Sequence, residues 1–407
     1  MFNVAAHGHV QPSLEVIREL VARGHRVTYA IAEEFAELVA STGAEPRVHS
    51  SSLPPKDDTD AWGTELTGHL RLFLAEAGRA LPQLTEAYGN DRPDLVLHDP
   101  VAYAGRVLAD RWGVPAVQVS PTAVAWEGYE DDIRDGTGPD AAAHGWLGAA
   151  GLAAGRAARR PERCVVVISK VLQPHADRVD GSVYSFTGPC RGSGTDRDDW
   201  RRPPHAERVV LVSLGTIFTR APALYRACLA AFGGLPGWHV VLQTGGGIDP
   251  ADLGELPDNV ELRGWIPQLS IMDRVDAFIT HAGPGSIQVA LAHGVPMVAV
   301  PQAADQFGNA RMLQELGVAH CLGKDEVTAE ALREAVCALV DDPEMAARGA
   351  SVRREMAAEG GTRRAADLIE AALPARDKGT TALGDMSRTA KTDLRIAAYA
   401  DANEANA

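Results

Sequence analysis

The sequence predicts an α/β protein of two doubly wound domains, each with a parallel sheet. Short apolar runs alternate with amphipathic helical patterns from the first residues, and the alternation stops near Gly188 and restarts at Arg208. A strand, a helix and a second strand in succession form the unit of a parallel sheet, because the crossover helix returns the chain beside the first strand. The 407 residues are enough for two full cores, so two such series indicate two domains.

The first series opens abruptly. Met1 to Ala6 leave room for only the last half of a buried strand, so we expect a protein start upstream of Met1. A helix is predicted from Pro12 to Val21, with proline in its first turn and a glycine after its end. The other predicted elements of this half are strands over 25–31, 94–98 and 115–119 and a helix over 101–112.

Two segments interrupt the alternation. Residues 131–163 are rich in Ala, Gly and Arg with weak periodicity, and we expect a helical or mobile insertion over a site. Residues 188–207 have the Gly, Ser, Asp and Pro content of a linker. We therefore predict an N-terminal domain over 1–190, a linker over 191–207 and a C-terminal domain over 208–376.

The second series runs to the end of the predicted C-terminal domain. Its predicted strands are 208–213, 239–243, 259–262, 275–280 and 296–300, and its predicted helices are 221–232, 285–293, 306–316, 328–341 and 362–373. Beyond these helices the chain is polar and small, and we expect residues 377–407 to be disordered. Two such domains are expected to leave a cleft between them. A ligand site is expected in this cleft, because open α/β sheets bind ligands at the carboxyl ends of their strands.

Composition excludes several classes of function. The formal net charge of −15 argues against nucleic acid or an anionic membrane as a partner, since both require clustered Lys and Arg. No apolar run approaches the roughly 20 residues of a membrane span and no secretory signal is visible, so we expect a cytoplasmic protein. The five cysteines are odd in number and widely spaced, which indicates neither a disulfide framework nor a zinc site.

A glycine-rich turn in the second half indicates a diphosphate site. His281 to Ser286 follows a predicted strand and opens a predicted helix. The small residues Gly283 and Gly285 let backbone N–H groups and the helix dipole face an anion, and His281 and Ser286 add side-chain donors. Alone, this segment could be a mere tight turn. The same phosphates could be approached from the end of the first strand of this half by Ser213, Gly215 and Thr216.

Two further motifs supply the remaining parts of a nucleotide-sugar site. Trp265 is suited to stack on a pyrimidine, with Gln268 nearby to bond the nucleoside. The alternative for this tryptophan is a buried core position. Asp305 and Gln306 could accept from and donate to vicinal sugar hydroxyls, whereas the alternative for the aspartate is a helix cap.

Two histidines, His7 and His9, lie at the first predicted strand-to-helix turn. They suggest a metal pair, but no third ligand has suitable spacing, so we expect no metal. A histidine here is better suited as a general base, since an unperturbed imidazole titrates near operating pH. Asp99 ends another strand at the same sheet edge; it would accept from Nδ1–H and leave Nε2 to take a proton from a hydroxyl. Its alternative role is turn formation before Pro100.

These residues together resemble the inverting, nucleotide-sugar-dependent glycosyltransferases of the GT-B fold, in which two Rossmann-like domains face a cleft. Among them, the sequence is most similar to bacterial macrolide glycosyltransferases. The resemblance extends to about Arg376 and includes the long stretches 20–30 and 360–367. It implies that His9 is the base and that Asp99 is its partner.

The resemblance also implies how the donor and acceptor are used. Trp265 would stack on uracil, the His281 to Ser286 turn would bind the diphosphate, and Asp305 with Gln306 would hold the hexose. An acceptor hydroxyl would attack the sugar C1 from the face opposite the leaving UDP, which inverts the anomeric centre. The reaction would need no metal or other cofactor. The protein would be a monomer or a homodimer. Candidate acceptor-lining residues, each equally suited to the core, are Trp62, Leu66, Leu70, Phe73, Leu74, Trp126 and Trp146.

One departure from the family pattern bears on the donor. Many UDP-dependent relatives have a glutamate eight residues after the motif histidine to hold both ribose hydroxyls, and this sequence has Val289 there. Either Gln288 substitutes, or the nucleotide lacks a 2′-hydroxyl, as dTDP does. Segment 131–163 also departs from the family in length and composition, so the acceptor is the least transferable inference.

Three functions remain open. The first is transfer of a hexose, glucose in the simplest case, from a UDP-sugar to a macrolide or related polyketide, which would inactivate the antibiotic. The second is a dTDP-deoxysugar transferase of antibiotic biosynthesis, favoured by Val289 and opposed by Gln268 together with Asp305 and Gln306. The third is a nucleotide-sugar-binding protein with impaired catalysis, against which the intact His9 and Asp99 count.

Overall fold

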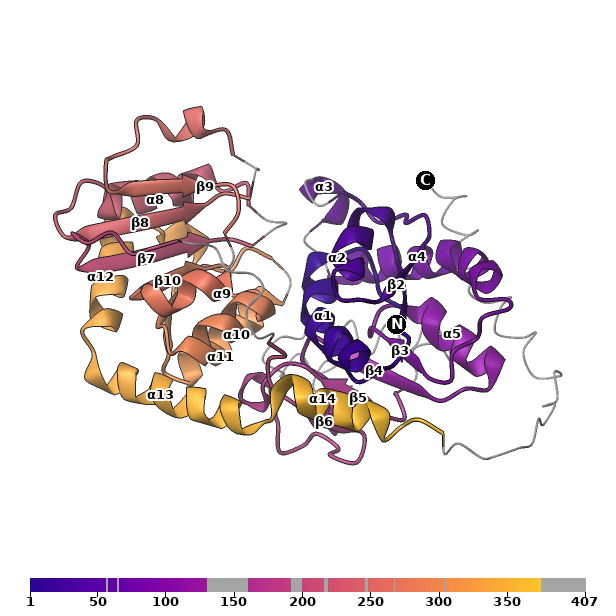
Figure 1. The fold of residues 1–407 in the computed structure, drawn as a ribbon. Coiled ribbons are helices and arrows are strands. Elements are labelled where there is room, and N and C mark those ends of the chain that lie inside the picture. Colours follow the sequence, from indigo (N-terminus) through magenta and orange to yellow (C-terminus); the bar gives the residue numbers. More distant parts are fainter. Residues whose placement is uncertain are drawn as a thin grey trace. The chain divides into compact units, whose positions relative to one another are not determined.

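Two compact units make up the part of the chain that the computed structural model describes (Figure 1). Unit 1 contains Met1–Pro54, Trp62–Arg191 and the chain from Glu359, and unit 2 contains Pro55–Ala61 and Gly192–Ala358. The described residues are 1–55, 58–63, 66–129, 160–191, 200–215, 219–245, 248–266, 268–303 and 305–374. Most of the predicted insertion and part of the predicted linker therefore lie outside them.

The sheet of unit 1 is parallel, and a single residue joins its two parts. Its strands are β1 (Thr28–Ile31), β2 (Glu45–Val48), β3 (Val96–His98), β4 (Ala116–Ser120), β5 (Cys164–Val166) and β6 (Tyr184–Phe186). Strand β1 pairs with β2, and β3 to β6 pair in sequence order. Phe2 forms parallel bridges to Ala30 of β1 and to His98 of β3, so it occupies the place of the predicted first strand. The order β2, β1, Phe2, β3 makes the junction of Phe2 and β3 the topological switch point of the sheet.

Three helices of unit 1, those over residues 7–22, 103–112 and 361–370, were predicted, the first of them with a later start, and the others were not. The helices of this unit are α1 (His7–Ala22), α2 (Ala36–Ala40), α4 (Leu66–Ala87), α5 (Tyr103–Trp112) and α14 (Gly361–Glu370), with short 3₁₀ turns at Glu33–Phe35 and Lys170–Leu172, and α3 (Thr59–Trp62) lies where the chain passes between units. Leu14, Ile17 and Leu20 form the buried stripe that drives α1. The helix begins at His7, not at Pro12, so both histidines lie in its first turn rather than in a loop before it.

The last helix corrects the predicted domain assignment. We placed residues 362–373 in the C-terminal domain, but α14 packs on α1 of unit 1. Arg23 donates to Asp367 at 2.6 Å and to Glu370 at 2.7 Å. Ile369 is buried in the core of unit 1. Helical periodicity identifies a buried face, but it does not identify the sheet that covers this face.

Unit 2 has the strand order β12, β11, β10, β7, β8, β9, with all pairs parallel. These strands are β7 (Arg208–Ser213), β8 (Trp238–Gln243), β9 (Val260–Arg263), β10 (Ala277–Thr280), β11 (Met297–Ala299) and β12 (Ala319–Cys321). The sheet reverses its winding between β7 and β10, which is its topological switch point. Every residue of β10 is buried, as expected for a parallel sheet covered on both faces.

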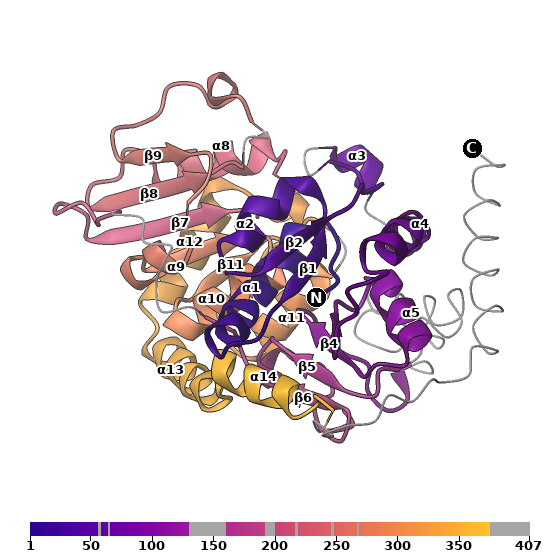
Figure 2. The same cartoon turned by 45° about the vertical axis from the view of Figure 1, so that its right-hand side comes forward.

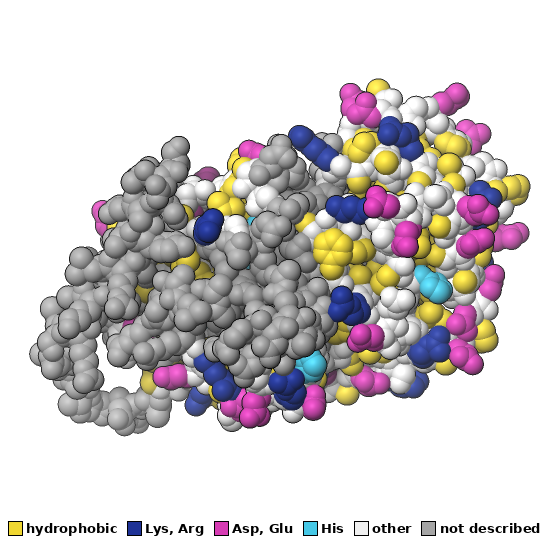
Figure 3. Space-filling model, turned by 180° about the vertical axis from the view of Figure 1, so that it is seen from behind, with side chains coloured by type: hydrophobic (Ala, Val, Ile, Leu, Met, Phe, Trp, Pro, Cys, Tyr) yellow, Lys and Arg dark blue, Asp and Glu magenta, His cyan; other side chains and the backbone are white. Residues whose placement is uncertain are grey.

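Helices flank this sheet in the predicted order. They are α8 (Pro222–Phe232), α9 (Gln268–Ile271), α10 (Pro284–His293), α11 (Gln306–Glu315), α12 (Ala329–Val340) and α13 (Pro343–Ala358), with 3₁₀ turns at Pro250–Leu253, Met272–Arg274 and Lys324–Glu326. Helix α8 packs on β8 and against α12, whereas α10 packs against α13 (Figure 2). On the face drawn in Figure 3, acidic and basic side chains of the described residues are interspersed. No helix in the described part of the chain is long and apolar enough to cross a membrane.

Gly105 of α5 provides a stability test of the Phe2 position. A Cβ added at Gly105 would lie 2.5 Å from Cβ of Phe2 and 2.7 Å from its Cγ. Phe2 is 2% exposed and is fixed on both sides by the sheet, so it has no room to move. We expect Gly105→Ala to lower the free energy of unfolding by about 1–3 kcal/mol, although alanine ordinarily favours a helix. Urea unfolding measures this change.

The control for this substitution is Gly181→Ala, because a Cβ added at Gly181 meets no atom within 4 Å. This variant is expected to unfold with the wild-type midpoint. A Gly105→Ala protein at least as stable as the wild type would contradict the close packing of α5 on Phe2.

Candidate functional site

The switch point of unit 1 brings together the two predicted catalytic residues. Asp99 directly follows β3, and His9 lies in the turn of α1 that follows Phe2. His9 Nδ1 lies 2.9 Å from Asp99 Oδ2, and the other carboxylate oxygen accepts from the backbone N–H of Val101 at 2.9 Å. A carboxylate oxygen only accepts, so Nδ1–H donates to Asp99 and Nε2 is left as the basic atom of the ring.

Aromatic side chains approach this histidine from α3 and α4. The Phe73 ring lies 5.8 Å from the His9 ring, edge to face, and the Trp62 ring lies 6.3 Å from that of Phe73. Both are more than nine-tenths buried, as is Leu74. The structure therefore places Phe73, one of the predicted acceptor residues, beside His9, and a second one, Trp62, against Phe73.

Trp126, another predicted acceptor residue, belongs to a different aromatic cluster. Trp126 is 6% exposed and packs against Tyr129 and His175, with ring centroids 4.7 Å and 4.8 Å away. The side chains of Leu66 and Leu70, and the whole of Trp146, lie outside the described residues.

His7 lies in the first turn of α1 together with His9. Its ring packs edge-on against Phe35 at a centroid distance of 4.8 Å. Within the described ranges, no group of three or more His, Cys, Asp or Glu side chains could hold a metal ion.

The switch point of unit 2 assembles the predicted diphosphate turn. Ser213 at the end of β7 is in register with Thr280 at the end of β10, so Gly215 and His281 follow at the same sheet edge. Helix α10 begins with Pro284, and its N-cap Gly283 supplies no side-chain cap. The first backbone N–H groups of a helix lack intrahelical partners, so this helix start presents donors and a positive dipole end to an anion. Thr216 lies outside the described residues.

The imidazole of His281 fills the space between two glycines. A Cβ on Gly215 would lie 2.7 Å from the ring, and a Cβ on Gly283 would lie 2.2 Å from its Nε2. Burial lowers the pKa of His281 to about 4, against the opposing effect of a hydrogen bond with the Ser213 backbone. The ring is therefore neutral near pH 7, so positive potential at this turn comes from the helix start rather than from a histidine cation.

Trp265 is 59% exposed, which excludes the core position left open by the sequence. It follows β9, and Gln268 begins α9 close behind it. Gln268 Nε2 donates to the hydroxyl of Ser213 at 3.5 Å. The amide thus lies at the end of β7, beside the diphosphate turn, while the indole offers an open face. Pro267 between them lies outside the described residues.

Asp305 and Gln306 have different environments. Gln306 is 5% exposed, and its side-chain oxygen accepts from the backbone N–H groups of Gln302 at 2.8 Å and Ala303 at 3.1 Å. It therefore shapes the loop before α11. Asp305 is the N-cap of α11 but its side chain makes no cap hydrogen bond, so the capping alternative is wrong.

Asn309 is a residue that the sequence analysis missed. Its amide donates to Asp305 Oδ2 at 3.2 Å and to the carbonyl oxygen of Ala282 at 3.0 Å. Ala282 has a left-handed φ of 64°, which costs energy for a residue other than glycine. Its N–H is also bonded, to the Thr280 hydroxyl at 3.2 Å. Asn309 thus ties the predicted hexose carboxylate to the diphosphate turn.

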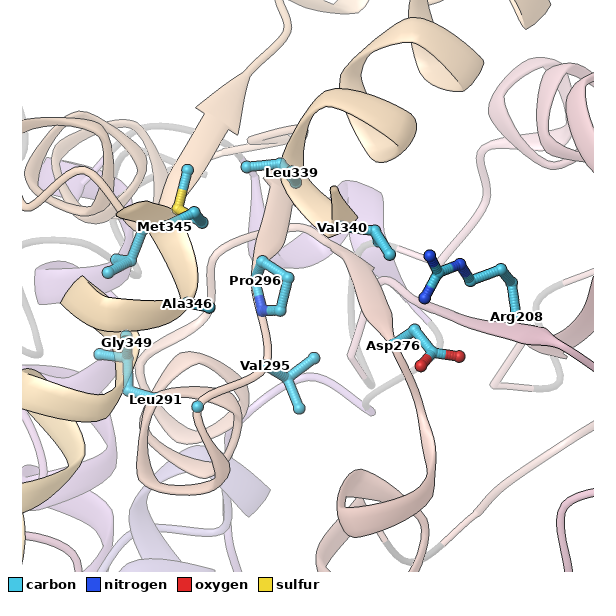
Figure 4. A pocket seen from close by; sticks show the side chains of 12 residues that line it. Arg208, Asp276, Leu291, Val295, Pro296, Leu339, Val340, Met345, Ala346 and Gly349 are labelled. Atoms are coloured by element: carbon cyan, nitrogen blue, oxygen red, sulfur yellow. The ribbon is translucent and has the colours of Figure 1, made fainter. Parts of the chain in front are cut away.

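A cavity of about 150 Å³ lies elsewhere in unit 2 (Figure 4). Arg208 and Asp276 line one side of it, and apolar residues such as Leu339 and Met345 line the rest. Arg208 begins β7 and Asp276 precedes β10, so the cavity is at the amino ends of the strands. Ligands of open α/β sheets bind at the carboxyl ends, and this cavity is therefore not the candidate site.

Several known proteins are similar to this chain in sequence and in fold. Residues 239–371 match the family model described as "Erythromycin biosynthesis protein CIII-like, C-terminal domain". The chain is 56% identical to oleandomycin glycosyltransferase of Streptomyces antibioticus, over 95% of this chain and 93% of that protein. It is 32% identical to demethyllactenocin mycarosyltransferase of Streptomyces fradiae, over 91% and 86%. The crystal structure of the glycotransferase of kitacinnamycin is 45% identical, with a TM-score of 0.80 over 91% of this chain and 97% of that one.

The fold and the site define a GT-B glycosyltransferase, in agreement with the predicted fold class. More narrowly, the chain belongs to the family of bacterial glycosyltransferases that includes the oleandomycin enzyme.

Proposed function

We propose that the protein is an inverting O-glycosyltransferase that moves a hexose from a nucleoside diphosphate sugar to a hydroxyl of a macrolide or related polyketide. The observation that carries this proposal is the His9–Asp99 pair, 2.9 Å apart at the switch point of unit 1. A histidine held in one tautomer by a buried carboxylate is suited to take a proton from a hydroxyl. The acceptor class is supported by the oleandomycin and demethyllactenocin relatives, which are named for such compounds.

The proposed reaction is a single displacement. His9 Nε2 takes the proton of the acceptor hydroxyl as that oxygen bonds to C1 of the sugar, and the bond from C1 to the nucleoside diphosphate breaks. The departing negative charge is stabilised by the N–H groups and dipole at the start of α10. Asp305, held by Asn309, accepts from sugar hydroxyls and keeps the hexose in place.

We propose UDP-glucose as the donor, because the family resemblance implies that the Trp265 indole stacks on uracil, and this indole is 59% exposed with Gln268 close behind it. The alternative is a dTDP-deoxysugar, and one observation favours it. Gln288 is 5% exposed whereas Val289 is partly exposed, so the more accessible of these two positions of α10 carries no group that could bond a ribose hydroxyl. Transfer from UDP-glucose would fit a role in antibiotic inactivation, and transfer from dTDP-deoxysugar would fit biosynthesis.

We propose that no metal ion takes part, since the backbone N–H groups at the start of α10 supply hydrogen-bond donors to the leaving group. Transfer is therefore expected to proceed at an unchanged rate after dialysis against EDTA. A loss of activity restored by Mg²⁺ would contradict this part of the proposal.

The exposed indole of Trp265 is proposed to stack on the base of the donor. Trp265→Ala is expected to weaken binding of UDP by about 1–3 kcal/mol, or roughly 5–150-fold, the range of base stacking on an aromatic side chain. Isothermal titration calorimetry with UDP measures this loss. Because the side chain is 59% exposed, the thermal unfolding midpoint should not change, and a Trp265→Phe variant should recover part of the affinity. Unchanged UDP affinity in the alanine variant would remove Trp265 from the donor site.

A mass-spectrometric transfer assay tests the proposed function. The protein is incubated with a desosamine-bearing macrolide and either UDP-glucose or a dTDP-deoxysugar. A hexosyl adduct from UDP-glucose supports the first donor, and an adduct from the dTDP-sugar alone supports the second. Binding of nucleotide sugar without transfer to any of a panel of hydroxyl acceptors would leave a binding protein and contradict the proposal.

A further inference from the structure

A chain of buried polar groups runs beneath the first turn of α1. Asn3 Nδ2 lies 3.0 Å from the carbonyl oxygen of His9 and 2.8 Å from the hydroxyl of Tyr29. The Tyr29 hydroxyl lies 2.8 Å from that of Ser13, which donates to the carbonyl oxygen of Val10 at 2.8 Å. Asn3, Ser13 and Tyr29 are each at most 5% exposed.

The groups at the two ends of this chain, the Asn3 amide and the Val10 carbonyl, determine which atom donates in every hydrogen bond. An amide nitrogen only donates, so Asn3 Nδ2 uses its two hydrogens on His9 and Tyr29. The Ser13 proton goes to Val10, so the Tyr29 hydroxyl donates to the Ser13 oxygen. Burial raises the pKa of Tyr29, so it keeps its proton. All three side chains are therefore satisfied in one arrangement only.

The strand segment that carries Asn3 also holds the partner of the base. The carbonyl oxygen of Phe2 accepts from the backbone N–H of Asp99 at 3.0 Å. The Asn3 side chain thus bonds the backbone of His9, and the main chain of the preceding residue, Phe2, bonds the backbone of Asp99. Both attachments hold the backbones of the two residues whose side chains meet at 2.9 Å, Nδ1 of His9 and Oδ2 of Asp99.

The start of α1 needs such support. Its N-cap is Ala6, which gives no side-chain cap, and the first turn of an uncapped helix frays readily. Displacing a reacting group by about 1 Å can lower a rate by roughly 10²-fold. A base in this turn would lose its alignment with Asp99 unless buried side chains bonded the backbone of the turn.

We propose that Asn3, Tyr29 and Ser13 are positioning residues for His9, forming a hydrogen-bonded brace that fixes the first turn of α1 against the Phe2–Asp99 junction. The assignment of a catalytic role to His9 rests on the proposed function, but the brace itself does not. None of the three side chains needs to touch substrate. Their effect on transfer comes through the backbone of His9 and Val10.

Tyr29→Phe tests the brace, because it removes one oxygen and keeps the ring. We expect kcat to fall by about 10-fold or more, while the KM for the nucleotide sugar stays within twofold, since the donor residues belong to unit 2. Ser13→Ala is the second variant if Tyr29→Phe does not fold, and the same division between kcat and KM is expected. Thr42→Val is the control: its buried hydroxyl bonds the carbonyl oxygen of Val39 at 2.6 Å in the same unit and has no link to His9.

A second readout is independent of transfer. Imidazole ¹⁵N NMR of the ligand-free protein, assigned with His9→Gln, is expected to show a single Nδ1–H tautomer of His9 in the wild type and in Thr42→Val, and a mixture of tautomers in Tyr29→Phe. A Tyr29→Phe protein with wild-type kcat and a single tautomer would overturn the proposal. If the wild type transfers no sugar but His9 still shows mixed tautomers in Tyr29→Phe, the result supports the brace and contradicts the proposed function.

Discussion

Turnover is expected to fall by about 10²–10⁴-fold when His9 is replaced by alanine, because the acceptor hydroxyl then loses its proton acceptor in the transition state. UDP affinity should not change, since the residues proposed to bind the nucleotide lie in unit 2. Steady-state transfer measures the first quantity and calorimetry with UDP the second. Asp99→Asn should also lower turnover, because an amide in contact with Nδ1 no longer selects the Nδ1–H tautomer.

A matched control for this substitution is His25→Ala. His25 belongs to the same unit and pairs with Glu370 through Nε2 at 2.8 Å, and its side chain is 34% exposed. Its loss is expected to change stability by no more than about 1 kcal/mol and turnover not at all. Wild-type turnover in His9→Ala would remove this histidine from the mechanism.

Loss of donor binding by roughly 10²-fold is expected for Gly283→Ala. The added Cβ would lie 2.2 Å from Nε2 of His281, a distance that no relaxed structure allows, so either the ring or the turn must move. The ring has little room on its other side, where Gly215 lies with a left-handed φ of 79°. The displaced turn would no longer direct the N–H groups of α10 at the diphosphate. Calorimetry with UDP measures the loss.

The control for Gly283→Ala is Gly181→Ala, which adds a methyl group to open space in unit 1. Circular dichroism should show that Gly283→Ala is folded, since the change is confined to the turn before α10. A folded Gly283→Ala protein that binds UDP with wild-type affinity would show that the diphosphate does not depend on this turn.

Much of the fold could be predicted from the sequence because its strands are buried on both faces. Strand β7 is a continuous apolar run, and its predicted range of 208–213 matches the structure. Strands β5, β6 and β12 have only three residues each, too few for a periodic pattern. Helices α4 and α13 were also missed, and in α13 charged residues and glycine weaken the apolar stripe.

The candidate site was partly predictable for a similar reason. Asp99 and His281 each directly follow a strand, and His9 lies in the first turn of the helix after the Phe2 segment; strand ends and helix starts can be located from local patterns. Their supporting contacts come from distant parts of the chain: Asn3 meets Tyr29 across 26 residues, and Asn309 meets Ala282 across 27. No local pattern encodes such pairs, so the brace and the Asn309 tie became visible only in the folded chain.

The most direct test of the central claim is the anomeric configuration of the product, measured by ¹H NMR on the purified glycoside made from UDP-α-glucose. Single displacement with His9 as the base predicts a β-linked glucoside from the wild type and its near absence with His9→Ala. An α-linked product, or equal amounts of the β-linked product from both proteins, would contradict this account.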